Sequence, residues 1–220
     1  MDKIKLGVLV GGTSIEREVS KKSCENLLAN LDENKYDITV YHLPADGNTE
    51  WAKNIISNPP QIVLSALHGG NGENGSIQGF LHCLNIPYIG SKVLSSAICM
   101  NKAMAKTVMK ANHIQIPDHV FVMRGVDFSQ YEESIKLMGF PLIVKPNRGG
   151  SSIGVIVARN MEDIHYGIKN IMENYDDDVL IEKFIDGKEI NCCVLQGENG
   201  PEAMAVLDVK KAGSVFVYDD

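Results

Sequence analysis

The segment KPNRGGSSIG, residues 145–154, places a lysine, an arginine, three glycines and two serines between two apolar runs. The flanking runs, PLIVKP (141–146) and IGVIVA (153–158), have the length and composition of β-strands. The segment is therefore predicted to form the tip of a β-hairpin. Its glycines allow backbone amides to approach phosphate oxygens closely, and the Lys145 ammonium adds positive charge.

Two common phosphate-binding patterns do not fit this hairpin. A P-loop requires GxxxxGK[ST] at the start of a helix, and a dinucleotide fingerprint requires GxGxxG between a strand and a helix. Residues 149–154 instead run from one strand into another. Considered alone, the segment is more typical of an ordinary glycine turn. The other interpretation is a flexible lid over a triphosphate, with Lys145 reaching in from the preceding strand.

The chain around the hairpin is predicted to be an α+β unit with an antiparallel sheet and two helices. Its expected strands are 119–123, 141–146, 153–158, 178–185, 189–196 and 202–209, and its expected helices are 131–138 and 161–174. We place the boundary of this unit near 112–116, because Pro117 ends the helical stretch 95–112. The predicted domains are therefore 1–113 and 114–220.

The first domain alternates strands and helices, which predicts a parallel sheet with helices on both faces, a Rossmann-like α/β fold. The expected strands are 4–10, 38–43 and 62–67, and the expected helices are 15–31 and 51–57. Ligands of such folds bind where loops leave the carboxyl ends of the strands. Two loops there, GGTSIERE (11–18) and HGGNGENG (68–75), are rich in glycine and polar groups. We expect them to form half of a site.

Composition restricts the classes of function. The 220 residues, 44% of them hydrophobic and 22% charged, can bury a substantial core. A net charge of −7, from 21 basic and 28 acidic residues, argues against nucleic-acid binding. The sequence has neither a run long enough to span a membrane nor a leader pattern, so we expect a cytoplasmic protein without membrane attachment. Five cysteines without CxxC spacing are expected to be mostly buried free thiols.

Five ordered segments over nearly the whole chain resemble the D-alanine–D-alanine ligases of the ATP-grasp superfamily. They are GGTSIEREVSKKS (11–23), LHGGNGENGSIQGFL (67–81), IPYIGSKVLSSAICMNK (86–102), GFPLIVKPNRGGSSIGV (139–155) and VLIEKFIDGKEI (179–190). The resemblance implies a pre-ATP-grasp domain followed by an ATP-grasp subdomain. It also implies a cytoplasmic homodimeric ligase that uses ATP and Mg²⁺ or Mn²⁺. The carboxylate of one D-alanine would become an acyl phosphate, which the amine of a second D-alanine attacks. The resulting dipeptide would supply peptidoglycan synthesis, on which the cell wall and cell shape depend.

The resemblance assigns two residues to the first D-alanine. Glu16 would bind its ammonium and His68 would lie near its carboxylate, which suits their charges. The residues alone leave alternatives open. Thr13 and Glu16 have the T-x-x-E spacing of a capping box, and His68 could be a turn histidine. In GEN, Asn74 replaces the family's usual aspartate, a departure that we expect to be tolerated.

The resemblance also assigns the residues that bind ATP. Lys102 and Lys145 would hold its phosphates and stabilise the transferring phosphoryl group. Ser151, which in the family hydrogen-bonds Glu16, and Ser152 would clamp the γ-phosphate from the hairpin. The adenosine positions are Glu182, Lys183, Ile185 and Glu189, with main-chain groups of Lys183 and Ile185 reading the base. Without the resemblance, each of these charges is more typical of a solvated surface.

The family continues past the point that corresponds to Asp220, with a mobile loop and the acids that bind magnesium. We therefore expect no metal ligands within this chain and a missing C-terminal catalytic part, with turnover depending on that part. Tyr218 lacks the flanking lysine of the family's loop tyrosine. Two alternatives stay open: a truncated non-catalytic nucleotide-binding or dimerisation fragment, and a ligase that joins D-alanine to D-serine or D-lactate.

Overall fold

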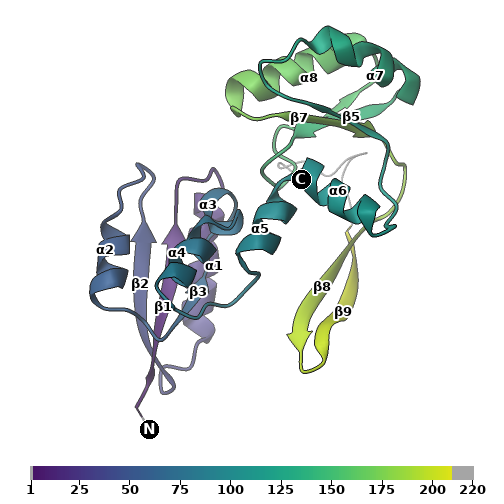
Figure 1. The fold of residues 1–220 in the computed structure, drawn as a ribbon. Helices are drawn as coiled ribbons and strands as arrows, with labels where there is room; N and C mark the ends of the chain where they lie inside the picture. The colour runs from purple at the N-terminus through teal and green to yellow at the C-terminus, as the bar shows by residue number, and fades with distance from the viewer. Residues whose placement is uncertain (1, 210–220) are drawn as a thin grey trace. The chain divides into compact units, whose positions relative to one another are not determined.

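The computed structural model describes residues 2–209, which divide into two compact units (Figure 1). The first unit ends at Val108 and the second begins at Met109. The division falls inside helix α6 (Lys102–Ala111), a few residues before the boundary expected between residues 113 and 114. The assignment of domains at that boundary stays a prediction.

The first unit is built on a parallel sheet of three strands in the order β2-β1-β3. The strands are β1 (Ile4–Gly11), β2 (Tyr36–Leu43) and β3 (Ile62–Ser65). Their common direction brings the loops after β1 and β3 to one edge of the sheet. The prediction of a parallel sheet at the start of the chain is confirmed.

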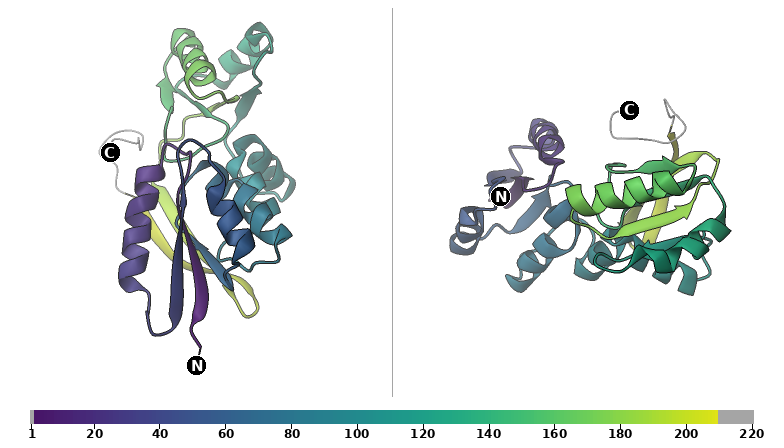
Figure 2. Two further views of the ribbon diagram at one scale, coloured as in Figure 1. Left: turned by 90° about the vertical axis from the view of Figure 1, so that its left-hand side faces the viewer. Right: turned by 90° about the horizontal axis from the view of Figure 1, so that it is seen from above.

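Helices cover both faces of this sheet, and the two faces of β1 explain why its sequence is almost continuously apolar. Leu6, Val8 and Val10 pack with Cys24 of α1, whereas Leu9 packs on the other face. Figure 2 shows α1 on one side of the strands and α2 on the other. The helices of the unit are α1 (Arg17–Asn30), α2 (Glu50–Ser57), α3 (Gly70–Glu73), α4 (Ser76–Cys83), α5 (Val93–Met100) and the start of α6.

The second unit contains an antiparallel sheet of four strands in the order β4-β7-β5-β6. Helices α7 and α8 lie along one face of it (Figure 1), and their isoleucines, among them Ile135 and Ile164, pack against Leu142 and Val144 of the sheet. The elements are β4 (His119–Val122), the 3-10 helix η1 (Phe128–Tyr131), α7 (Glu132–Met138), β5 (Leu142–Pro146), β6 (Ile156–Ala158), α8 (Met161–Asn174) and β7 (Val179–Lys183). The predicted fold class, α/β followed by α+β, is confirmed.

The last two strands depart from the prediction of one sheet. Within residues 2–209, β8 (Glu189–Gly197) and β9 (Gly200–Val209) pair only with each other. Both strands are exposed along almost their whole length, so the expectation of buried thiols is wrong for Cys192 and Cys193. Cys83 and Cys99 are also exposed, so Cys24 is the only buried thiol among the five free cysteines, all of which lie within the described residues. Among residues 2–209, no helix combines the length and apolar character that crossing a bilayer requires.

Candidate functional site

Glu16 lies where two glycine-rich loops meet at the carboxyl edge of the first sheet. Helix α1 begins at Arg17, so Glu16 immediately precedes the helix and its side chain makes no capping hydrogen bond. The capping-box alternative, which would place Glu16 inside the first turn, is therefore wrong. The residue is 9% exposed, and a Cβ added at Gly69 would collide with its carboxylate and lie 2.7 Å from Ser14 Oγ. Gly69 thus lets the loop after β3 pack against the loop after β1.

His68 follows β3 and is held by a residue of helix α1. Its Nε2 shares a hydrogen bond of 2.8 Å with Ser23 Oγ, and its Nδ1 lies 3.9 Å from Glu73 Oε1. The partner Ser23 is 45 positions away in sequence, so His68 does more than satisfy its own turn. The imidazole is about one third exposed. Sequence reasoning missed Ser23, because no spacing rule connects a helix serine with a distant loop.

A cavity of about 150 Å³ opens beside His68 at the same edge of the sheet. Three loops line it: residues 11–14 after β1, residues 43–49 after β2 and residues 67–72 after β3. The loop after β2 was not expected to contribute. Trp51 of α2 and Ile77 of α4 add apolar walls. This combination of apolar walls and convergent polar groups is typical of small-molecule sites.

Lys145 and Glu182 form an ion pair on the second sheet. Ile143 lies directly opposite Glu182 in the antiparallel register, and Lys145, two residues further along β5, projects from the same face as both. That face is opposite the one on which Val144 packs under α7 and α8. Both side chains are largely shielded from water, with 20% and 10% exposed. The ammonium is therefore fixed at the end of β5, where the glycine hairpin begins.

The glycine hairpin connects β5 and β6, which pair antiparallel as predicted. Its backbone is unusual, because Gly149 and Gly154 have φ of 98° and 72°, and Ser151 and Ser152 have φ of 50° and 55°. Non-glycine residues rarely adopt this left-handed region, which costs roughly 1–2 kcal/mol each. Among the described residues, a Cβ added at Gly149 or Gly150 would meet nothing within 4 Å. The tip thus presents backbone that another group can approach closely.

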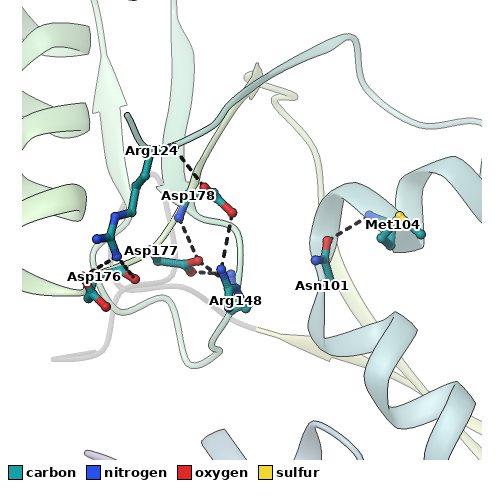
Figure 3. Close-up of polar contacts among 7 residues, drawn as sticks. All are labelled: Asn101, Met104, Arg124, Arg148, Asp176, Asp177 and Asp178. Carbon is teal, nitrogen blue, oxygen red and sulfur yellow. Dashed lines mark hydrogen bonds and ion pairs between the residues drawn. The ribbon is translucent and has the colours of Figure 1, made fainter. Parts of the chain in front are cut away.

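The other predicted site residues lie at element ends. Lys102 is the first residue of α6, which Asn101 caps by accepting a hydrogen bond of 3.0 Å from the Met104 N–H (Figure 3). The Lys183 N–H donates to the Asp118 carbonyl at 2.9 Å and is thus engaged within the protein. Ile185 lies on the connection between β7 and β8 and is 64% exposed. Glu189 is the first residue of β8.

Metal ligands were not expected within this chain. Across residues 2–209, the structure contains no group of three or more histidine, cysteine, aspartate or glutamate side chains that could hold a metal ion. No chemical step is therefore derived through a metal ion at these residues. Tyr218 lies outside the described residues.

Comparisons with known proteins identify the family of the chain. The family description "D-ala D-ala ligase C-terminus" matches residues 108–220, and "D-ala D-ala ligase N-terminus" matches residues 49–91. A D-alanine–D-alanine ligase of Bacillus anthracis is 38% identical over 217 residues, which cover 98% of this chain and 67% of that protein. The chain thus spans about two thirds of the length of this relative.

Two solved structures extend the comparison. The Bacillus anthracis D-alanine–D-alanine ligase complexed with ATP has a TM-score of 0.81 and 35% identity, over 95% of this chain and 67% of that one. The VanG D-Ala:D-Ser ligase of Enterococcus faecalis has a TM-score of 0.83 and 27% identity, over 99% and 73%. From its sequence and its fold, the chain belongs to the D-alanine–D-alanine ligase family of enzymes.

Proposed function

We propose that this protein ligates two D-alanines to D-alanyl-D-alanine at the expense of ATP, through an acyl phosphate. The product would be a peptidoglycan precursor, made in the cytoplasm by a homodimer. The observation that carries this proposal is the 38% identity, over nearly the whole chain, to a relative that bears the name D-alanine–D-alanine ligase.

The first unit would bind the first D-alanine. In this proposal the buried Glu16 carboxylate pairs with its ammonium, because a carboxylate shielded from water favours a cationic partner. His68, oriented by Ser23, would face the carboxylate of the same amino acid. The adjacent cavity of about 150 Å³ supports the proposal, since D-alanine has only six non-hydrogen atoms.

The second unit would bind the nucleotide. The arrangement fits a polyphosphate, because the Lys145 ammonium is fixed at the base of a hairpin in which a Cβ added at Gly149 or Gly150 would meet no described atom within 4 Å. Lys145 would bind phosphate oxygens, and Ser151 and Ser152 would donate hydroxyl hydrogens to the γ-phosphate. Lys102, at the start of α6 in the first unit, would also bind phosphate oxygens. The adenosine would lie along β7 and the connection after it, at Glu182, Lys183, Ile185 and Glu189. Bound ATP supplies the phosphoryl group, while these residues orient it.

A D-alanine–D-serine ligase is the second candidate. It is favoured by the fold similarity to the VanG D-Ala:D-Ser ligase, which extends over 99% of this chain. Both reactions share the first substrate and the acyl phosphate, so they differ only in the amine that attacks it. The choice of acceptor therefore separates the two candidates.

The test is phosphate release from ATP by the purified chain with magnesium or manganese. Parallel reactions contain D-alanine, D-alanine with D-serine, L-alanine or no amino acid, and the dipeptides are identified by mass spectrometry. Release that requires D-alanine, together with D-alanyl-D-alanine as product, is the expected result. A mixed D-alanyl-D-serine product would favour the second candidate. ATP binding without turnover in any reaction would contradict both and support a non-catalytic nucleotide-binding fragment.

A further inference from the structure

The connection between α8 and β7, residues 175–178, contacts the start of the glycine hairpin (Figure 3). The Asp177 carboxylate accepts hydrogen bonds from the Arg148 backbone N–H at 2.5 Å and from Arg148 Nε at 3.0 Å. Arg148 Nη2 lies 3.3 Å from Asp178 Oδ2. Both the main chain and the side chain of Arg148 are therefore held by this connection.

These contacts continue the pairing of β5 with β7. Pro146 pairs with Val179 at the end of the ladder, and the Asn147 N–H then donates to the Asp178 carbonyl at 2.9 Å. The Asp177 carboxylate receives the next N–H along the chain, that of Arg148. The hairpin thus leaves the sheet three residues beyond Lys145, and Asp177 fixes the point of departure.

Asp177 is buried, with 5% of its surface exposed, which is unusual for an aspartate. Its carboxylate accepts a third hydrogen bond, from the Asp178 N–H at 2.8 Å, so its burial is compensated by three donors and one positive charge. The fork of Arg148 allows Nε to bond Asp177 while Nη2 faces Asp178. Replacing the carboxylate by an amide would leave too few acceptors for these donors.

The same connection also contacts the far end of the hairpin. Gly154 has φ of 72°, and a Cβ added there would lie 3.1 Å from Tyr175 Cε2 and 3.1 Å from Pro146 Cγ. A Cβ added at Gly149 or Gly150, at the tip, would meet no described atom within 4 Å. The segment is therefore held at both ends by residues 175–178 and the end of β5.

We propose that Asp177 is a positioning residue for nucleotide binding, which anchors the start of the hairpin through Arg148. The anchor fixes the positions of Lys145 and of the first hairpin amides relative to each other, because both belong to the end of β5 that Asp177 holds. Asp177 acts only through Arg148. The inference rests on the proposed nucleotide-binding role of the hairpin.

The preceding residue in the same connection, Asp176, offers a matched control. Asp176 forms an ion pair with Arg124, and its side chain is 85% exposed. Asp176 has φ of 52°, a conformation that asparagine tolerates well. Asp176→Asn and Asp177→Asn therefore remove the same charge from adjacent positions, but only the second change affects the anchor of the hairpin.

The experiment measures backbone amide hydrogen exchange in residues 147–155 without nucleotide, and the Kd for ATP by calorimetry, in the full chain and its variants. Loss of hydrogen bonds to a buried carboxylate is expected to speed exchange and to weaken ATP binding by about tenfold in Asp177→Asn. In Asp176→Asn, the exchange rates and the Kd for ATP should stay within about twofold of those of the parent chain, because exposed ion pairs contribute little to stability. Exchange and affinity in Asp177→Asn that match those of Asp176→Asn would overturn the inference.

Two further comparisons keep the outcome decisive. Arg148→Lys retains the charge and the backbone N–H but loses the fork, so it should give a smaller change in the same direction, even if Asp177→Asn fails to fold. Asp177→Glu should recover part of the slow exchange, because it restores the acceptors. If hydrogen exchange is faster in Asp177→Asn than in the parent chain but the parent chain binds no ATP, the proposed function is contradicted and the anchor itself is supported.

Discussion

The two glycine-rich loops of this protein use glycine for opposite reasons. In the loop after β3, a Cβ at Gly72 would lie 2.5 Å from Leu67 Cβ, and a Cβ at Gly69 would collide with Glu16. In the hairpin after β5, a Cβ at Gly149 or Gly150 would meet no described atom within 4 Å. The first loop is thus closely packed against its own unit, whereas the tip of the second is open.

Under the proposed function, this difference would separate a preformed amino-acid site from a nucleotide site that closes. A packed loop holds Glu16 and His68 in one geometry before any ligand arrives, which lowers the entropy cost of binding. An open glycine tip anchored at its base can close over a ligand and bring amides to its oxygens. Substitution of individual glycines tests the contrast directly, since alanine adds only the missing Cβ.

The largest effect is expected for Gly72→Ala in the packed loop. The new Cβ would lie 2.5 Å from the Cβ of Leu67, an atom near the main chain that cannot turn away. Overpacking of this kind costs about 1–3 kcal/mol. We expect the free energy of unfolding of the first unit, measured by urea denaturation, to fall by about that amount.

Gly79→Ala is the matched control, because Gly79 lies in helix α4 and its added Cβ would meet no described atom within 4 Å. Alanine in a helix is favoured over glycine by about 0.5–1 kcal/mol, so this variant should be as stable as the parent or more stable. Equal loss of stability in both variants would show that the loop after β3 is not packed as described.

A smaller effect is expected for Gly154→Ala at the anchored end of the hairpin. The residue has φ of 72°, and its Cβ would press on Tyr175 and Pro146 at 3.1 Å. Alanine in the left-handed region costs about 1–2 kcal/mol, and the Tyr175 ring can yield by a few tenths of an ångström. Thermal unfolding of the second unit should shift downward accordingly. An unchanged transition would contradict the described contact between the hairpin and Tyr175.

The preformed character of the first loop also depends on Ser23. Ser23→Ala removes the 2.8 Å hydrogen bond to His68 Nε2 and frees the imidazole to rotate. The loss of one such bond corresponds to about 1 kcal/mol, so the D-alanine concentration at half-saturation should rise about fivefold. Lys22→Ala, at an exposed neighbouring position of α1, should leave it unchanged. If the D-alanine concentration at half-saturation were the same in Ser23→Ala as in Lys22→Ala, Ser23 would not orient His68.

Local patterns were sufficient to predict most of the fold. The apolar run of β1 predicted a strand buried on both faces, and the two runs around residues 145–154 predicted the β5–β6 hairpin. These features depend on residues that are close in sequence. Helix α8 was predicted with its observed bounds, 161–174, and in the structure Asn160 caps its start by accepting a hydrogen bond from the Asp163 N–H.

Features that depend on distant partners could not be predicted. The run of three aspartates at 176–178 is typical of a solvated turn, yet Asp177 is buried by its contacts with Arg148, 29 positions away. The T-x-x-E spacing at Thr13 suggested a capping box, but the helix starts after Glu16. In β8, the sequence predicted a strand with buried cysteines, but the strand is exposed along almost its whole length.

The smallest effect on stability is expected for Gly150→Ala, and it sharpens the contrast most. Its Cβ would enter open space, and its φ lies outside the left-handed region, so the free energy of unfolding should change by less than about 0.5 kcal/mol. ATP binding should nevertheless weaken, because the methyl group would occupy space that a phosphate needs when the tip closes. Calorimetric titration with ATP, beside urea denaturation, separates the two quantities. If affinity and stability were both unchanged, the open tip would be an ordinary turn, and the contrast between the loops would concern packing alone.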